Sequence, residues 1–294
     1  MSEPFFSIVI PTYKSSKTIA RTLKSIQKQT TQDFEIIVVD DASDDFLSLA
    51  QVIEDFRKFN LDIKIHHFEE NKNGAAARNY GIKKSSGKYI AFLDSDDEWA
   101  RDKLLKYKDI ILKEKTDKKI YYSQIEIISD GKKSNRILPK HPIRDGQSAA
   151  LYMFGYAGMI QTSTIVLKRE YALSILFNEN YRRHQDLDFC VRASVLGFDF
   201  IMINESLSIY HVSHNVNISV KKESISYSKF WVKDMKGYLT EREISCFNAY
   251  ILPFKYLNEG DKIGALKTLL LNAPKAGMKI FLFNLKNKLN RFLE

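Results

Sequence analysis

Strand and helix patterns alternate through the first hundred residues, and this alternation is the feature that most constrains the fold. Short apolar, β-branched runs predict strands over residues 5–10, 34–39, 62–68 and 89–93. Helical patterns predict helices over residues 19–26, 46–59 and 75–81. Strands that alternate with helices in this way favour a mostly parallel sheet with helices on both faces. We therefore expect an α/β fold.

Each predicted strand runs into polar residues at its carboxyl end. These residues are Pro11, Thr12 and Tyr13, then Asp40 and Asp41, then Glu69 and Asn71, then Asp94 and Asp96. In open α/β sheets, ligands bind beyond the carboxyl ends of the strands. The chain contains neither Gly-x-Gly-x-x-Gly nor Gly-x-x-x-x-Gly-Lys-Ser/Thr, so a dinucleotide fold and a P-loop are not supported. The phosphates of a bound nucleotide would need another partner, such as a metal ion.

The segment 89–99, YIAFLDSDDEW, places four carboxylates directly after a predicted buried strand. Asp94 and Asp96 are two residues apart, so on extended chain they can project to the same side. Their hard oxygen atoms suit Mg²⁺ or Mn²⁺, which proteins often bind with one or two carboxylates plus substrate phosphates. The alternative is that Ser95, Asp96 and Asp97 only cap a helix that begins at Trp99.

The middle of the chain continues the mixed pattern. A lysine-rich helix over residues 100–114 is predicted to turn Leu104, Leu105 and Ile111 inward. A hairpin is predicted over residues 120–128 and 132–138, because Asp130-Gly131 is a turn signal. The segments that follow are a strand over residues 161–167 and a helix that buries Leu187, Val191 and Val195.

Four ordered segments resemble glycosyltransferase family 2. They are residues 7–13 (SIVIPTY), 34–43 (FEIIVVDDAS), 73–79 (NGAAARN) and 87–97 (GKYIAFLDSDD). The similarity covers roughly residues 5–215, and four motifs in order are far more specific than one. The resemblance implies a GT-A fold and inverting transfer from a nucleotide-diphosphate sugar. It implies a catalytic domain over residues 1–220, with residues 1–100 as the nucleotide-binding half and 101–220 as the acceptor-binding half.

The resemblance also implies roles for single residues. The residues it assigns to nucleotide binding are Pro11, Thr12, Tyr13, Asp41, Arg78, Asp94 and Ser95. Tyr13 would stack on the base, Asp41 would accept a hydrogen bond from the base edge, and Arg78 would reach the base or the diphosphate. Each has a simpler alternative: Tyr13 covers the edge of the sheet, Asp41 caps a helix, and Arg78 lies on a solvated helix face.

The expected catalytic base is Asp186. The family usually has a Glu-Asp pair here, and this chain has Gln185-Asp186, so the supporting residue departs from the family pattern. Asp188 is two residues further on, and on a helix the two carboxylates point about 200° apart, so only one can face the cleft. The alternative is that Asp186 only complements the dipole at the start of its helix.

The resemblance implies a divalent metal cofactor, Mn²⁺ or Mg²⁺. Asp96 would bind the ion directly, and Asp94 would contact the ribose or the ion. His214 is the candidate for a third metal ligand or a phosphate donor, with His211 as the alternative.

Composition limits the class of protein. The net charge of +9 and the pI of about 9.2 favour an anionic partner, which includes nucleotide sugars, lipid phosphates, a membrane surface and nucleic acid. Cys190 and Cys246 are too few for a disulfide framework or a zinc site and suggest a reduced, intracellular chain. Neither a signal peptide nor an apolar run of membrane-spanning length is evident, so we expect a cytoplasmic protein.

Residues 221–294 are expected to form a helical appendage. A helical hairpin is predicted over residues 256–271, with Asp261 as the cap of its second helix and Pro274 as its end. Residues 275–293 form a basic amphipathic pattern. Such a helix can lie on the cytoplasmic face of an anionic bilayer, or pack on the catalytic domain or a second subunit.

These observations lead to one main hypothesis and two alternatives. The main hypothesis is an inverting transfer from a UDP-sugar to a hydroxyl of a saccharide acceptor. By resemblance, the acceptor is expected to be a lipid-diphosphate-linked oligosaccharide in the synthesis of O-antigen, capsule or a related surface polysaccharide. A nucleotidyltransferase would need a glycine- and lysine-rich N-terminal signature, which the sequence lacks. A nucleic-acid-binding module would cluster its basic residues, whereas here they are scattered, so no nucleic acid partner is expected.

Overall fold

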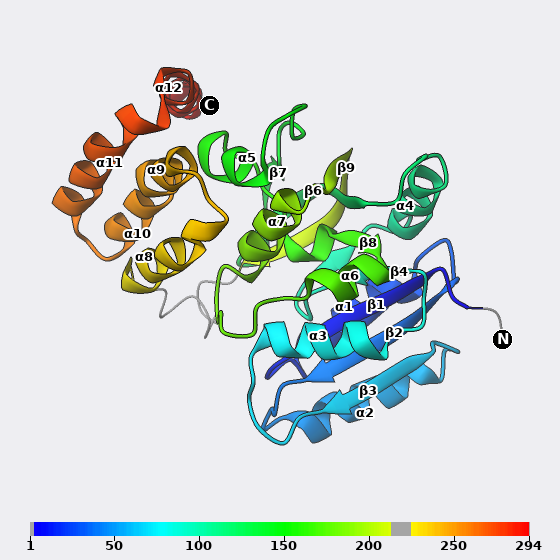
Figure 1. The fold of residues 1–294 in the computed structure, drawn as a ribbon. Coiled ribbons are helices and arrows are strands. Elements are labelled where there is room, and N and C mark those ends of the chain that lie inside the picture. The colour runs from blue at the N-terminus through cyan, green and yellow to red at the C-terminus, as the bar shows by residue number, and fades with distance from the viewer. Residues whose placement is uncertain (1–2, 213–224, 294) are drawn as a thin grey trace. The chain divides into compact units, whose positions relative to one another are not determined.

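The computed structural model describes residues 3–212 and 225–293 and divides the chain into two compact units (Figure 1). The sheet unit comprises residues 1–140, 160–189 and 198–214. The helical unit comprises residues 141–159, 190–197 and 215–294. The domain boundary expected between residues 220 and 221 falls outside the described residues and stays a prediction.

The sheet unit is built on one nine-stranded sheet with the order β3-β2-β1-β4-β8-β6-β9-β5, with β7 paired to β6. Its strands are β1 (Phe6–Thr12), β2 (Phe34–Asp40), β3 (Ile63–His67), β4 (Tyr89–Phe92), β5 (Glu98–Trp99), β6 (Lys119–Ser129), β7 (Lys132–Leu138), β8 (Val166–Lys168) and β9 (Asp199–Val212). The first four strands pair in parallel, and β8 joins β4 antiparallel. The expected α/β fold with a mostly parallel sheet, and the β6–β7 hairpin, are confirmed.

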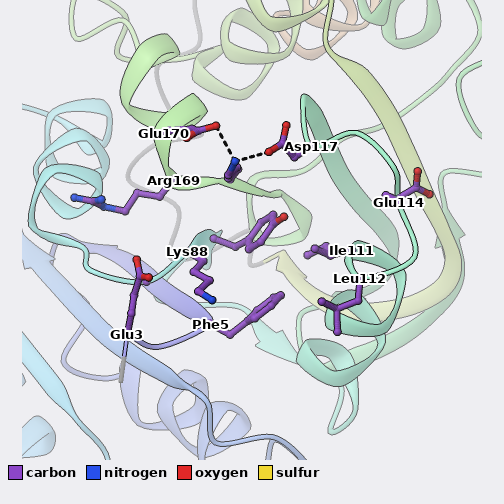
Figure 2. Close-up of a pocket in the computed structure, with 12 residues that line it drawn as sticks. Glu3, Phe5, Lys88, Ile111, Leu112, Glu114, Asp117, Arg169 and Glu170 are labelled. Carbon is purple, nitrogen blue, oxygen red and sulfur yellow. Dashed lines mark hydrogen bonds and ion pairs between the residues drawn. The ribbon is translucent and has the colours of Figure 1, made fainter. Parts of the chain in front are cut away.

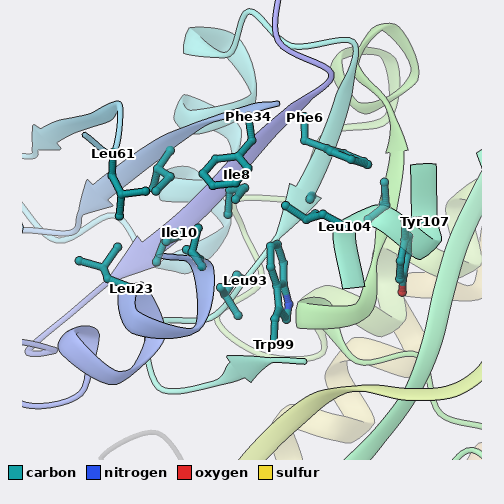
Figure 3. Packing of buried hydrophobic residues seen from close by; sticks show 14 of the residues in the cluster. Phe6, Ile8, Ile10, Leu23, Phe34, Leu61, Leu93, Trp99, Leu104 and Tyr107 are labelled. Atoms are coloured by element: carbon teal, nitrogen blue, oxygen red, sulfur yellow. The ribbon is translucent and has the colours of Figure 1, made fainter. Parts of the chain in front are cut away.

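Helices cover both faces of the parallel part of the sheet (Figure 1). They are α1 (Ile19–Gln27), α2 (Phe46–Arg57), α3 (Gly74–Lys84), α4 (Lys103–Ile111), α6 (Arg169–Ile175) and the start of α7 (Gln185–Val195). Figure 3 shows Ile8 and Ile10 of β1 packed in one cluster with Leu23 of α1. On the other face, α3 lies so close to β1 that a Cβ at Gly81 would come within 2.4 Å of Val9 Cγ1. Alternation along buried strands therefore supplies both cores.

Four local predictions were wrong. Trp99 lies in strand β5, paired with β9, and the next helix begins only at Lys103, so Asp96 and Asp97 do not cap it. Leu105, which was expected to face inward, is 40% exposed, whereas Lys103 is buried. Residues 161–167 are not one strand, because a short 3₁₀ turn, η1 (Thr162–Thr164), precedes β8. In α7, Val195 is exposed and Asp188 is buried, so the inward face is rotated from the apolar spacing.

The helical unit contains α5 (Ala149–Gly155), α8 (Ile225–Asp234), η3 (Met235–Gly237), α9 (Glu241–Tyr250), α10 (Leu252–Asn258), α11 (Lys262–Ala276) and α12 (Met278–Leu293). Its core brings together the rings of Phe154, Trp231 and Phe247. The Asp261 side chain accepts a hydrogen bond from the Gly264 amide at 2.7 Å, which confirms the predicted cap of α11.

The predicted end of α11 was wrong. Pro274 lies inside the helix, which continues to Ala276. Proline at this position removes one backbone hydrogen bond, and the helix continues for only two more residues. Gly277, with φ of +99°, ends the helix instead, since glycine adopts that conformation without strain.

Two further sequence expectations concern the described residues as a whole. Cys190 and Cys246 are both buried, and neither forms a disulfide bond. None of the helices within residues 3–212 and 225–293 is long and apolar enough to cross a bilayer.

Candidate active site

Parallel pairing brings the polar strand ends together. In the register of the sheet, Thr12 at the end of β1 pairs with Asp40 at the end of β2. Strand β4 lies on the other side of β1 and ends at Phe92, two residues before Asp94. The polar residues after β1, β2 and β4 therefore share one edge of the sheet, as the sequence led us to expect.

Asp41 is buried and holds the loop that leads into α3. Its Oδ1 accepts from the Lys72 amide at 2.6 Å, and its Oδ2 accepts from the Asn73 amide and from Asn71 Nδ2, both at 2.8 Å. Burial raises the pKa of Asp41, against these hydrogen bonds. Because a carboxylate oxygen has two lone pairs, Oδ1 keeps one for a further donor.

The other candidates near β1 differ in accessibility. Tyr13 is 45% exposed, so its ring is available for stacking. Pro11 is buried, and the buried hydroxyl of Thr12 lies 3.0 Å from Asp40 Oδ1. Ser95 is buried, with its hydroxyl 2.8 Å from the hydroxyl of another loop serine. Of this group, Tyr13 is the side chain best placed to contact a ligand.

Arg78 connects the two expected halves of the site. This residue of α3 is 8% exposed. Its Nη2 donates to Asp94 Oδ1 at 2.5 Å and its Nη1 donates to Gln185 Oε1 at 2.8 Å. The guanidinium carbon lies 5.4 Å from the centre of the Phe177 ring. The acidic loop after β4 and the first turn of α7 are therefore held by one cation.

Asp97 anchors the acidic loop, residues 93–97, to the interior of the sheet unit. It is completely buried, and its carboxylate accepts from Ser163 Oγ at 2.6 Å, Gln161 Nε2 at 2.8 Å and the His211 amide at 3.2 Å. The Ser163 hydroxyl also accepts from the Asp94 amide at 3.0 Å. Burial, followed by the charges of neighbouring carboxylates, raises the pKa of Asp97 well above its ordinary value. Asp97 thus has a structural role that fixes Asp94.

Asp96 fits a divalent cation by its electrostatics. Burial, together with the charge of Asp94, raises the pKa of Asp96 to about 6. Two neighbouring carboxylates with too little compensating charge form the hard, anionic donor set that Mg²⁺ or Mn²⁺ prefers. Among the described residues, no group of three or more His, Cys, Asp and Glu side chains could hold a metal ion. Ligands from a bound substrate would have to complete the coordination.

The structure describes only one of the two candidate histidines. His214 lies outside the described residues. His211 Nε2 lies 2.7 Å from Glu98 Oε1, and burial lowers the pKa of its imidazole. The imidazole of His211 on β9 is therefore paired with Glu98 of β5.

Asp186 lies in the first turn of α7. Its Oδ1 accepts from the Leu187 amide at 2.9 Å. Burial raises the pKa of Asp186, while the charge of Arg78 lowers it and the charge of Asp94 raises it, so these three groups lie within electrostatic reach of one another. Asp188 is completely buried, whereas Asp186 keeps an exposed fraction.

Sequence reasoning gave no role to Tyr210, which lies on β9. Burial raises its pKa, and the charges of Asp94, Asp96, Asp97 and Asp186 all add to that rise. Its phenol therefore lies within electrostatic reach of all four carboxylates. Position alone gave no signal, because the strand that carries it reaches the site only through pairing with β5 and β6.

Lys103 was also missed, since it lies in a lysine-rich helix. It is completely buried, with Nζ 3.2 Å from both Tyr107 Oη and Ser208 Oγ. Those two hydroxyls donate their own hydrogens to the carbonyl oxygens of Thr164 and Ser163, so the amine must donate to each. Burial lowers the pKa of Lys103 well below its ordinary value. Two N–H groups of the amine satisfy the two hydroxyls, and the nitrogen also lies 4.2 Å from the centre of the Tyr107 ring.

This sheet, with an acidic loop after β4 and a carboxylate at the start of α7, has the arrangement of the GT-A fold. Residues 7–173 match the family model described as "Glycosyl transferase family 2". The chain belongs to this family.

Two relatives with glycosyltransferase names support this assignment. The chain is 44% identical over 268 residues to "Amylovoran biosynthesis glycosyltransferase AmsB" of Erwinia amylovora, which covers 90% of this chain and 89% of that protein. It is 37% identical over 132 residues to "UDP-Glc:alpha-D-GlcNAc-diphosphoundecaprenol beta-1,3-glucosyltransferase WfgD" of Escherichia coli, over 44% of this chain and 49% of that protein.

The solved structure supports the fold alone. The crystal structure of S. aureus TarS 1-349 in complex with UDP-GlcNAc superposes with a TM-score of 0.67 at 18% identity, over 95% of this chain and 83% of that chain.

Proposed function

We propose that the protein transfers a sugar from a UDP-sugar to a hydroxyl of a saccharide acceptor, with inversion at the anomeric carbon. The observation that carries this proposal is the Arg78 bridge, which ties Asp94 of the acidic loop to Gln185 beside Asp186. The carboxylate proposed to bind the donor and the carboxylate proposed as the base would thereby be held at one site. The names of WfgD and of the TarS complex, which contain UDP, support UDP as the nucleotide.

The nucleotide would bind at the ends of β1 and β2. The exposed Tyr13 ring would stack on the base, and the free lone pair of Asp41 Oδ1 would accept from the base imide. Arg78 is already shared by Asp94 and Gln185, so its contact with the diphosphate would be made from that fixed position. Pro11, Thr12 and Ser95 would shape the site through the backbone, because their side chains are buried.

Asp96 and Asp94 would hold Mn²⁺ or Mg²⁺, with His214 as the proposed third ligand. When bound, such an ion neutralises the charge that develops on the departing diphosphate. The loop that carries these carboxylates is kept rigid by Asp97, so their spacing is set before substrate binds.

Asp186 would act as general base. The acceptor oxygen forms a bond to the anomeric carbon while the bond from that carbon to the diphosphate oxygen breaks, and the hydroxyl proton passes to the Asp186 carboxylate. The transition state would resemble an oxocarbenium ion. Because inversion occurs in one displacement, no nucleophile from the protein is needed. The raised pKa of Asp186 makes it a better proton acceptor than an ordinary aspartate.

The acceptor is proposed to be a lipid-diphosphate-linked oligosaccharide at the cytoplasmic face of a membrane, in the synthesis of O-antigen, capsule or a related surface polysaccharide. The similarity to AmsB supports the process, and the diphosphoundecaprenol acceptor in the name of WfgD supports the lipid carrier. The experiment is a donor screen that measures UDP release from several UDP-sugars with Mn²⁺ and with EDTA. Metal-dependent release with one donor is expected, and no release from any donor in the presence of a lipid-linked acceptor would refute the proposal.

A further inference from the structure

Two pockets lie apart from the candidate active site, and their charges differ. The first has a volume of about 580 Å³ and lies at the amino ends of β1 and β4 (Figure 2). The dashed lines from Glu170 and Asp117 in Figure 2 mark their ion pairs with Lys168, which lies 2.9 Å from Glu170. The lining holds three cations and four carboxylates, so this pocket gives no reason to expect an anionic ligand.

The second pocket, here called the lysine pocket, lies within the helical unit and has a volume of about 520 Å³. Its lining includes Lys229 and Lys233 of α8, Lys236 of η3 and Lys267 of α11. Among the described residues that line it there is neither Asp nor Glu. Several like charges around one cavity repel each other, and a bound anion relieves that repulsion.

The interior of the lysine pocket is partly apolar. Val232 and Leu252 are buried at its wall, and Asn248 and Thr268 add neutral polar groups. The Lys229 ammonium lies 5.1 Å from the centre of the Tyr256 ring, which also lines the pocket. Cations around an apolar floor suit an anionic group attached to an apolar body better than a free inorganic ion.

An exposed apolar face adjoins the pocket on α11. Ile263, Leu266 and Leu270 follow one another at helical spacing and are 81%, 57% and 63% exposed. Leu271, which is 59% exposed, also lines the pocket. The residues on the opposite side of α11 are buried: Ala265, Ala273 and Ala276. The apolar face of α11 is therefore turned away from the core of its own unit.

Charge decides which partner this face fits. Residues 262–286 contain lysines at positions 262, 267, 275, 279 and 286, and neither Asp nor Glu. Two copies of so cationic a surface would repel one another, which disfavours self-association through it. An apolar face flanked by lysines is the pattern that binds an anionic bilayer.

We propose that the lysine pocket binds the phosphate or diphosphate head group of a membrane lipid, with the apolar face of α11 against the lipid chains. This inference deepens the proposed function, because a lipid-diphosphate-linked acceptor presents the same head group. The four pocket lysines would bind the phosphate oxygens, and the exposed leucines would bury part of the prenyl or acyl chain.

The test compares a pocket variant with a control of equal charge by calorimetry on the full chain. The pocket variant is K229Q/K233Q/K236Q/K267Q, and the control is K262Q/K275Q/K279Q/K286Q, whose lysines are exposed in the same unit but do not line the pocket. The probe is farnesyl diphosphate, with inorganic diphosphate and farnesol as separate arms. We expect the pocket variant to lose at least about tenfold in affinity for farnesyl diphosphate and the control less than about twofold.

Several results would overturn the inference. Equal losses in both variants would show a general charge effect, and absence of saturable binding would remove the site. Inorganic diphosphate that binds as tightly as farnesyl diphosphate would reject a lipid ligand in favour of a free phosphate. UDP affinity should be unchanged in both variants. If farnesyl diphosphate binds as expected while no UDP-sugar is turned over, the proposed function fails and the lipid site stands.

Discussion

Gln185 accepts a hydrogen bond from Arg78 Nη1 at 2.8 Å, and it does so one residue before Asp186. A neutral amide at this position accepts from the guanidinium without adding negative charge to a region that already holds Asp94 and Asp96. The other terminal nitrogen of the same guanidinium, Nη2, donates to Asp94 Oδ1 at 2.5 Å. The pairing of Arg78 with a glutamine thus limits the negative charge around Asp186.

Gln185→Glu should change the pH dependence of transfer. A carboxylate next to Asp186 would disfavour its ionised form and raise its pKa further. A general base works deprotonated, so the acid limb of the profile of kcat against pH should move to higher pH. Gln185→Met, which adds no charge, is the matched control and should leave the limb near its original position. A limb that moves to lower pH in Gln185→Glu would contradict the electrostatic account.

Lys103 should tolerate loss of its amine better than a permanent charge. Lys103→Met leaves two hydroxyls without a donor and should cost about 1–3 kcal/mol. Lys103→Arg introduces a guanidinium that cannot deprotonate, and a buried charge without a carboxylate partner should cost about 3–5 kcal/mol. Urea unfolding of both variants measures the difference. If Lys103→Arg is the milder change, the buried amine is charged in the native protein.

Asp96 should make the metal-free protein less stable as pH rises. Its pKa is about 6 in the folded chain against an ordinary value of 3.8, so the folded state binds more protons between these values. The contribution of Asp96 to stability is complete below the lower value and is lost as pH rises through the folded pKa. Asp96→Asn should flatten this decline in unfolding experiments across the interval.

Metal binding follows the same titration with the opposite sign. Because the ion binds the ionised carboxylate, Mn²⁺ affinity should fall as pH drops below about 6. A Mn²⁺ affinity that is constant across this range would argue against Asp96 as a ligand.

The sequence predicted the parts of the site that depend on local pattern. Short continuous apolar runs located β1, β2 and β4, and parallel pairing then placed Tyr13, Asp41 and Asp94 at one edge. These positions follow from strand ends alone, so no long-range information was needed.

The parts that sequence reasoning missed depend on partners far along the chain. Asp97 is anchored by Ser163, 66 residues later, and Lys103 by Ser208, 105 residues later. Trp99 looked helical locally but pairs with β9, where the sheet hydrogen bonds outweigh a weak helix preference. The local sequence around Asp97 and Lys103 does not predict their burial, because the partners that bury them come from distant segments.

The most direct test of the central claim is Asp186→Asn, assayed for both transfer and UDP binding. The amide keeps the shape of the side chain but cannot accept the acceptor proton, so we expect transfer to fall by about 10²–10⁴-fold. UDP affinity with Mn²⁺ should stay within about twofold, because the proposed base would act on the acceptor hydroxyl and not on the nucleotide. Equal losses of transfer and of UDP affinity, or transfer that persists, would contradict its role as the base.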